Sequence, residues 1–110
     1  MNYSEAKEIM AKARDKSKGA PLGNNTRLFE HAVSTSDVYY SVRLHNTDVV
    51  NIYKNGCYSL NSGGWRTRTT QDRINTYSPI RVYADKGTWH IGAIVFVDGI
   101  VINSKLLGDK

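Results

Sequence analysis

The segment from residue 38 to residue 61 limits the fold most strongly, because its pattern is that of an antiparallel β-sheet. In its first part apolar side chains alternate with polar ones, as in a strand with one buried face; the apolar positions are Val38, Tyr40, Val42 and Leu44. A turn at Asn46-Thr47 is then expected to lead into a second strand at 48–54, and the hairpin signal Asn55-Gly56 into a third at 57–61. The segment therefore predicts a meander with one polar face, which would display Arg43, His45, Asn51, Ser59 and Asn61.

The N-terminal residues predict an amphipathic helix within residues 1–19. Asn2 and Glu5 have the spacing of a capping box, and apolar residues then recur at helical intervals towards Gly19, which favours a helix end. The other face carries cations that we interpret as solvated, namely Lys7, Lys12, Arg14 and Lys16. Residues 20–25 are rich in turn formers and predict a connector to the sheet.

The C-terminal half predicts a second helix and further strands. A short helix is expected at 70–77, where Pro79 ends it. Strands are expected at 80–84, 88–97 and 100–103. The run within 88–97 is continuously apolar, which predicts a strand at the centre of the sheet rather than at its edge.

Together these elements predict one α+β domain spanning residues 1–110. A chain of 110 residues is long enough for one modest core and too short for two. We expect a twisted antiparallel sheet of roughly five or six strands in the region 27–104, an N-terminal helix at 1–19, and a short helix inserted after the third strand. The strand edges of so small a sheet are compatible with a homodimer.

Charge and cysteine content restrict the class of protein. The chain has 15 Lys plus Arg against 10 Asp plus Glu, a net charge of +5, which is mild for a dedicated DNA binder and argues against mimicry of DNA. A single cysteine, Cys57, excludes an intramolecular disulfide, and no apolar stretch approaches the roughly 18 residues of a spanning helix or resembles a signal peptide. We therefore expect a cytoplasmic protein without membrane contact.

The segment 60–75 carries the richest binding chemistry. Gly63-Gly64 permits close backbone approach, and Thr69 or Thr70 can cap a helix whose N–H groups attract an anion. Arginines in the segment suit phosphates or carboxylates, and Trp65 offers a flat face for a base. The alternative is an ordinary loop that caps a helix and buries its tryptophan.

We expect Trp65 to be at least half buried as an anchor for this loop, so that Trp65→Ala would destabilise the fold by about 3 kcal/mol or more. Arg66 is expected to pair with Asp48 or with loop carbonyls, whereas Arg73, one turn into the helix, would be left for partner contact. Asp48 itself is expected to hold a turn or to pair with Arg43 or Arg66.

No catalytic arrangement emerges from the sequence. The zinc-ligand types His31, His45, His90 and Cys57 show no short paired spacing, so neither a metal nor another cofactor is predicted. His45 and Cys57 could approach each other across neighbouring strands, which leaves a metal or nucleophile pair there as an open alternative. We expect a protein that is not an enzyme.

Three groups of residues resemble motifs of a known protein family. They are 24–28 (NNTRL), 42–50 (VRLHNTDVV) and 60–75 (LNSGGWRTRTTQDRIN). In this order they resemble a family of small proteins encoded by bacteriophages, with a likeness that covers roughly residues 11 to 90 and omits the tail from Gly92. The resemblance singles out candidate binding residues in the matching motifs, namely Arg27, Arg43, His45, Asp48, Trp65, Arg66, Thr69, Thr70 and Arg73. Their structural alternative is a polar network that fixes the loop to the meander.

The resemblance implies a phage origin, and small phage accessory proteins often bind a host factor in the bacterial cytoplasm. The first hypothesis is a non-enzymatic anti-defence inhibitor, specifically an anti-CRISPR protein that binds a CRISPR nuclease. The second is a nucleic-acid binder that stacks bases on aromatic rings, and the third is a protein that sequesters a phosphorylated nucleotide. Phage origin favours the first hypothesis, whereas the residues alone favour the second or third.

Overall fold

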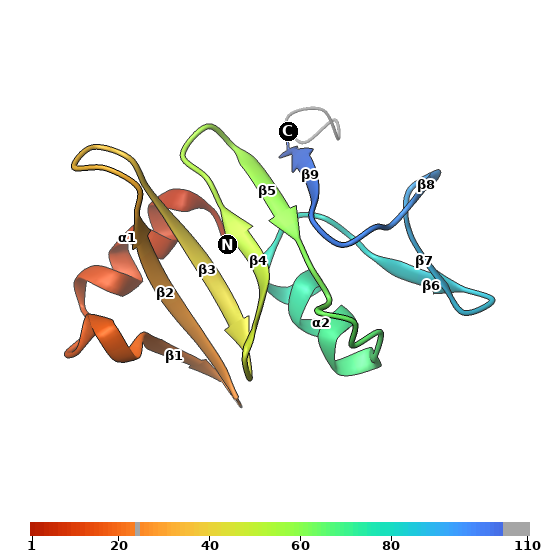
Figure 1. Ribbon diagram of the computed structural model, residues 1–110, viewed down its shortest axis with the longest axis horizontal. Coiled ribbons are helices and arrows are strands. Elements are labelled where there is room, and N and C mark those ends of the chain that lie inside the picture. The colour runs from red at the N-terminus through yellow and green to blue at the C-terminus, as the bar shows by residue number, and fades with distance from the viewer. Residues whose placement is uncertain (24, 105–110) are drawn as a thin grey trace.

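The protein is built on a six-stranded antiparallel sheet that carries both α-helices on one face (Figure 1). The computed structural model describes residues 1–23 and 25–104. The strand order is β1-β2-β3-β4-β5-β9. The strands span Ala20–Gly23, Thr26–Ala32, Val38–Leu44, Thr47–Ile52, Cys57–Leu60 and Ile100–Asn103, in that order. The helices are α1, Tyr3–Ala11, and α2, Arg68–Tyr77. The predicted α+β class is confirmed; Asn24 of the predicted connector and residues 105–110 of the predicted domain lie outside the described residues.

The capping box predicted for α1 is present. The Asn2 side chain accepts a hydrogen bond from the Glu5 N–H at 2.9 Å, and the Glu5 carboxylate accepts one from the Asn2 N–H at 2.9 Å. The helix ends at Ala11, earlier than predicted, because the Asp15 carboxylate accepts the Ser17 N–H and starts a separate 3₁₀ turn, η1, at Lys16–Lys18. Among the described residues, no helix combines the length and apolar character needed to cross a membrane.

The core lies between the sheet and the two helices. Ala6 and Met10 of α1 and Ile74 of α2 are fully buried against the inner face of the sheet. The inner face supplies alternate residues of the strands, as the period of two predicted, among them Leu28, Tyr40, Val42, Val50, Ile52, Tyr58 and Leu60. Burial and the nearby Glu30 carboxylate raise the pKa of Tyr40 to about 12.

A β-bulge interrupts the pairing of β3 with β4. Val42 pairs with Val50, but Arg43 pairs with Asp48, so Val49 is the extra residue and is buried. The bulge lies beyond the Arg43–Asp48 pair, which the tight turn between Leu44 and Thr47 sets on the outer face of the sheet.

Two predicted boundaries were wrong at the ends of the sheet region. The connector at 20–25 contains β1, an edge strand that pairs with β2 and tolerates Pro21 because an edge residue needs no ladder N–H. The strand predicted at 80–84 begins only at Tyr83, because the side chain of Asn75 binds both the N–H and the carbonyl of Val82. As predicted, α2 follows the strand at 57–60, which becomes β5 once β1 and β2 are counted.

The predicted central strand at 88–97 is also wrong. Gly92 adopts φ 58° and reverses the chain, so the run forms two short strands, β7 at Thr88–Ile91 and β8 at Ile94–Val95. They join β6, Tyr83–Asp85, in a separate three-stranded sheet beside the main one (Figure 1). As a result Ile94, Val95 and Val97 are 54%, 53% and 56% exposed.

Candidate functional site

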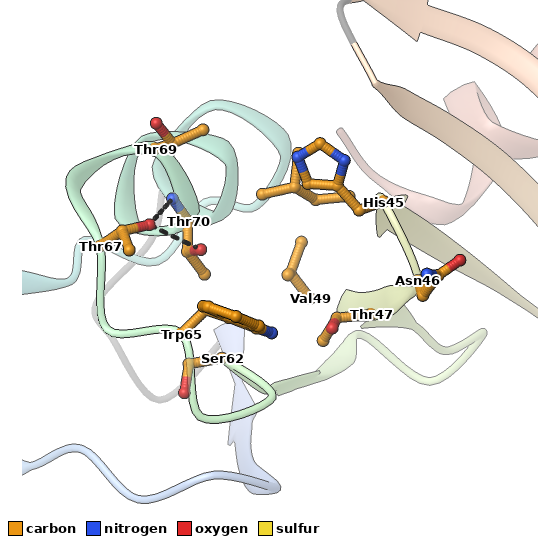
Figure 2. Close-up of a pocket in the computed structure, with 10 residues that line it drawn as sticks. His45, Asn46, Thr47, Val49, Ser62, Trp65, Thr67, Thr69 and Thr70 are labelled. Carbon is orange, nitrogen blue, oxygen red and sulfur yellow. Dashed lines mark hydrogen bonds between the residues drawn. The ribbon is translucent and has the colours of Figure 1, made fainter.

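Four of the predicted binding residues surround one cavity of about 440 Å³, and they are His45, Trp65, Thr69 and Thr70. The cavity lies between the β3–β4 turn, the loop at 61–67 and the first turn of α2 (Figure 2). Its other lining residues are Leu44, Asn46, Thr47, Val49, Ser62 and Thr67. Sequence motifs far apart in the chain therefore meet at this one place.

Trp65 is 67% exposed, so the prediction that it is at least half buried was wrong. Its backbone N–H closes a tight turn onto the Ser62 carbonyl at 3.0 Å, and this turn directs the indole towards the cavity (Figure 2). The buried tryptophan is instead Trp89, in β7. An exposed indole gives no reason for the loss of about 3 kcal/mol or more that was predicted for Trp65→Ala.

Arg66, the next residue, anchors the loop instead. Its guanidinium lies over the Trp89 ring at 5.2 Å and the Phe96 ring at 4.9 Å, and its Nη2 is 3.7 Å from the Asp98 carboxylate. Its Nε donates to the Ser62 hydroxyl at 2.9 Å. The predicted pairing of Arg66 with Asp48 was therefore wrong, because the Arg66 side chain is directed to Ser62, Asp98 and the aromatic rings of the small sheet.

Ser62 and Asp98 form the centre of this attachment. Ser62 is fully buried, and both its N–H and its hydroxyl donate to the Asp98 carboxylate, at 2.8 and 2.7 Å. Burial alone would raise the pKa of Asp98, but the hydrogen bonds from Ser62 and the charge of Arg66 outweigh burial and hold the pKa below its ordinary value. The sequence analysis missed both residues, since a lone serine and a distant Asp-Gly turn give no local signal.

The loop does not form the anion cradle suggested by its glycines. The Gly63 N–H donates to the Asn61 side chain at 2.7 Å, and the Gly64 N–H donates to the Ser62 hydroxyl at 3.2 Å. Helix α2 is capped by Thr67, whose hydroxyl accepts the Thr70 N–H, and not by Thr69 or Thr70 as predicted. The N–H groups of the glycine pair are thus already used within the loop.

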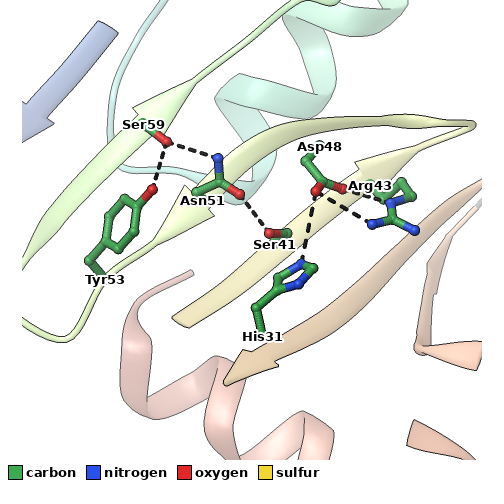
Figure 3. A network of polar contacts seen from close by, with 7 residues as sticks. All are labelled: His31, Ser41, Arg43, Asp48, Asn51, Tyr53 and Ser59. Atoms are coloured by element: carbon green, nitrogen blue, oxygen red, sulfur yellow. Dashed lines mark hydrogen bonds and ion pairs between the residues drawn. The ribbon is translucent and has the colours of Figure 1, made fainter. Parts of the chain in front are cut away.

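Arg43 and Asp48 form an ion pair on the outer face of the sheet, as predicted, with 2.6 Å between Nε and Oδ1. His31 approaches the same carboxylate at 3.9 Å. Beside this pair, hydrogen bonds connect side chains of three neighbouring strands and the residue after β4, namely Ser41, Asn51, Ser59 and Tyr53 (Figure 3). These contacts join strands of the meander to one another, whereas the predicted alternative was a polar network that fixes the loop to the meander.

Arg27 and Arg73 also hold the fold. Arg27 donates to the carbonyls of Lys18 and Gly19, at 2.7 and 3.1 Å. Arg73 donates to the Thr26 hydroxyl at 3.0 Å and its side chain is only 22% exposed. The structure therefore does not separate Arg66 from Arg73 in the predicted way, since both are held by intramolecular contacts.

His45 and Cys57 are not brought together. Leu44 pairs with Thr47 at one end of the β3–β4 hairpin, whereas Ile52 pairs with Tyr58 at the other end, which is where Cys57 begins β5. Within the described part of the chain, His, Cys, Asp and Glu side chains form no group of three or more that could hold a metal ion.

The fold and the site thus define a small α+β protein in which the candidate arginines make intramolecular contacts, while the cavity beside Trp65 and the side chains of Ile94, Val95 and Val97 are exposed. The chain belongs to the family of Kyanoviridae Gp96 proteins, whose family model matches residues 4–103. This is a phage-encoded family, as the motif resemblance implied, and the match extends into the tail that the resemblance omitted, as far as residue 103. No curated protein and no solved structure matches the chain.

Proposed function

We propose that this protein is a non-enzymatic anti-defence protein, an anti-CRISPR protein that binds a CRISPR nuclease in the cytoplasm of the bacterial host and blocks its activity. Membership of a phage-encoded family supports an action on the host. The observation that carries the proposal is an exposed apolar surface around the three-stranded sheet, because contiguous exposed apolar side chains mark sites of protein association.

The geometry of this surface follows from strand register. Tyr83 pairs with His90 and His90 pairs with Val95, so these three side chains form one row across the small sheet. The Tyr83 and His90 rings stack at 5.5 Å, and Tyr83 and Val95 are 41% and 53% exposed. Beyond β8, Val97 continues the exposed apolar surface. We call Tyr83, His90, Val95 and Val97 the apolar row.

The other side of the small sheet explains why the apolar row stays exposed. Trp89 and Phe96 pack edge to face at 5.4 Å on that side and are nearly fully buried, with Arg66 above their rings. The sheet therefore has one side fixed to the protein and one side free for a partner. Aromatic and aliphatic anchors of this kind supply most of the binding free energy at protein interfaces.

Binding without turnover demands high affinity. A stoichiometric inhibitor works only while its concentration exceeds both its target and Kd, so roughly nanomolar binding, about 12 kcal/mol, is required. A standard interface covers about 800 Å² on each partner, a modest share of the 6932 Å² surface of this protein. The net charge of +5 favours a partner with an acidic rim around an apolar centre.

The test is phage plating on cells that carry a CRISPR nuclease targeting the phage. Expression of the protein should restore plaque formation without altering nuclease abundance, and the purified protein should co-elute with the nuclease. Val95→Glu should abolish both effects, because it puts a charge into the apolar row. Val33→Glu is the matched control, since Val33 is 67% exposed in the β2–β3 loop at the far side of the molecule (Figure 1).

Retained targeting at saturating expression, across several nuclease types, would overturn the anti-CRISPR proposal. Equal loss of activity in Val95→Glu and Val33→Glu would instead remove the assignment of the interface to the apolar row. Circular dichroism and melting temperature should match the wild type for both variants, because both substitutions are at exposed positions.

A further inference from the structure

The cavity beside Trp65 is a second open feature, separate from the apolar row. Its volume of about 440 Å³ falls in the range of about 300–1,000 Å³ that is usual for small-molecule sites. Trp65 lines it, yet the residue is 67% exposed. An indole left uncovered at the edge of a cavity is a flat surface ready for a planar group to stack on.

The opposite walls of the cavity are fixed by the core. Val49, the bulge residue, and Thr70, in the first turn of α2, are both buried, and Figure 2 shows them beside the indole of Trp65. The Thr70 hydroxyl is engaged by the Thr67 hydroxyl at 3.1 Å, so Thr70 has its polar group occupied within the protein. The interior therefore favours an apolar ring over an anion.

Polar groups suited to the edge of a heterocycle lie around the cavity. His45, Asn46 and Thr69 line the cavity and are exposed. Their side chains make no hydrogen bond to any residue that the structure describes. The His45 imidazole can donate or accept a hydrogen bond at the edge of a nucleobase, whereas Figure 2 shows the Asn46 amide and the Thr69 hydroxyl directed away from the indole of Trp65.

The loop that carries Trp65 is rigid, which favours binding. A Cβ on Gly63 would lie 2.6 Å from the Thr47 hydroxyl oxygen, so the loop packs against β4 as closely as only glycine permits. Ser62 and Arg66 attach the same loop to Asp98 on its other side. The indole is thus held in place before a ligand arrives, and little ordering entropy opposes binding.

The stretch of chain that carries Trp65 is basic, which suits the phosphates that nucleobases bring with them, although Arg68 and Arg81 line a different hollow. Residues 61–90 carry five cations, Arg66, Arg68, Arg73, Arg81 and Lys86, against two anions, Asp72 and Asp85, a local net charge of +3. Arg68, the first residue of α2, is exposed. Arg66 and Arg73 are held by intramolecular contacts, so recognition rests on the ring, with phosphate adding affinity.

We propose that this cavity binds a nucleobase, stacked on Trp65 and contacted at its edge by His45. The base can come from a free nucleoside or nucleotide, or from an unpaired position of a single-stranded nucleic acid, because both present the same ring. This site does not depend on the apolar row or on the proposed anti-CRISPR function.

The experiment titrates the purified protein with the four ribonucleosides, their monophosphates, and single-stranded RNA and DNA hexamers. The exposed indole of Trp65 reports binding by fluorescence quenching, whereas Trp89 is buried and stays unaffected. Calorimetry supplies affinities for the variants. Stacking on one aromatic side chain contributes a factor of about ten or more per base, so Trp65→Ala should weaken binding at least about tenfold and Trp65→Phe should restore part of it.

Val33→Ala is the matched control, since Val33 is 67% exposed, as Trp65 is, and lies in the β2–β3 loop, outside both the cavity and the apolar row, so it should leave affinity unchanged. Binding of nucleosides that persists in about 1 M salt identifies a free base as the ligand, because the phosphate contribution is screened there. Binding of hexamers alone identifies a single strand as its source. Absence of quenching by every ligand at millimolar concentration, or equal affinity of Trp65→Ala and the wild type, would overturn the proposal.

Discussion

Ser62→Ala tests the claim that a buried serine, and not Trp65, attaches the loop at 61–67 to the small sheet. The Ser62 hydroxyl donates to Asp98 at 2.7 Å and accepts from Gly64 at 3.2 Å and from Arg66 at 2.9 Å. Alanine removes all three hydrogen bonds and leaves only the Ser62 N–H as a donor to Asp98. The side chain is fully buried, so water cannot take the place of the hydroxyl without opening the loop.

The expected magnitude follows from these three contacts. A neutral hydrogen bond contributes about 1 kcal/mol and one to a charged group about 1.5–3 kcal/mol, which would sum to roughly 4–7 kcal/mol. The side chains of Arg66 and Asp98 are 40% and 35% exposed, so water restores part of their hydrogen bonding. We therefore expect Ser62→Ala to lower the free energy of unfolding by about 2–3 kcal/mol, or the melting temperature by about 10 °C.

The assay is urea unfolding followed by circular dichroism at neutral pH. Ser36→Ala is the matched control, because Ser36 is exposed in the β2–β3 loop and the same substitution there should change the free energy by less than about 0.5 kcal/mol. Trp65→Ala should cost less than about 1 kcal/mol, since most of its surface is already in water. A smaller loss for Ser62→Ala than for Trp65→Ala would refute the assignment of the anchor.

Two further predictions concern the same region. The pKa of Asp98 is held below its ordinary value of 3.8, so the stabilisation by this carboxylate is fully present above about pH 4 and is lost as the pH falls through the lowered pKa. Urea unfolding from pH 6 to pH 3 should show this loss of stability. Asp98→Asn should flatten the pH dependence. Gly63→Ala should destabilise the protein by about 2 kcal/mol or more, because the new Cβ would lie 2.6 Å from the Thr47 side chain. Gly64→Ala should cost about 1 kcal/mol for its φ of 86° alone, because its new Cβ has no neighbour within 4 Å. Equal losses of stability in the two variants would contradict the close packing of the loop.

Local features of the fold were predictable because their causes lie within a few residues. The capping box of Asn2 and Glu5 requires only the spacing of a helical turn, and the alternation along β3 requires only the pleat of a strand. The Arg43–Asp48 pair was also predictable, since a short hairpin brings the two residues opposite each other. The glycine pair, by contrast, suggested an anion cradle, but the N–H groups of Gly63 and Gly64 donate to the side chains of Asn61 and Ser62.

The candidate binding residues do not form one site. Four of the nine, His45, Trp65, Thr69 and Thr70, line one cavity, and no sequence pattern indicated that Val49 would complete its wall. That residue becomes part of the site through a bulge, which depends on how β3 and β4 pair rather than on either strand alone.

The sequence by itself determined the α+β class, the start of the N-terminal helix and the pairing of the strands in the meander, because these depend on hydrogen bonds and periodicity within short stretches. Only the tertiary structure decided which of two adjacent residues, Trp65 or Arg66, would face inward. The Arg66 guanidinium has Asp98 and two aromatic rings to contact there, whereas the indole of Trp65 is left beside an open cavity. Likewise, Gly92 turns the most apolar run of the chain away from the sheet centre, and Val95 becomes surface because β9 already completes the sheet beside β5. Whether a side chain is buried thus depends on which elements pack against it, and these elements are distant from it in the sequence.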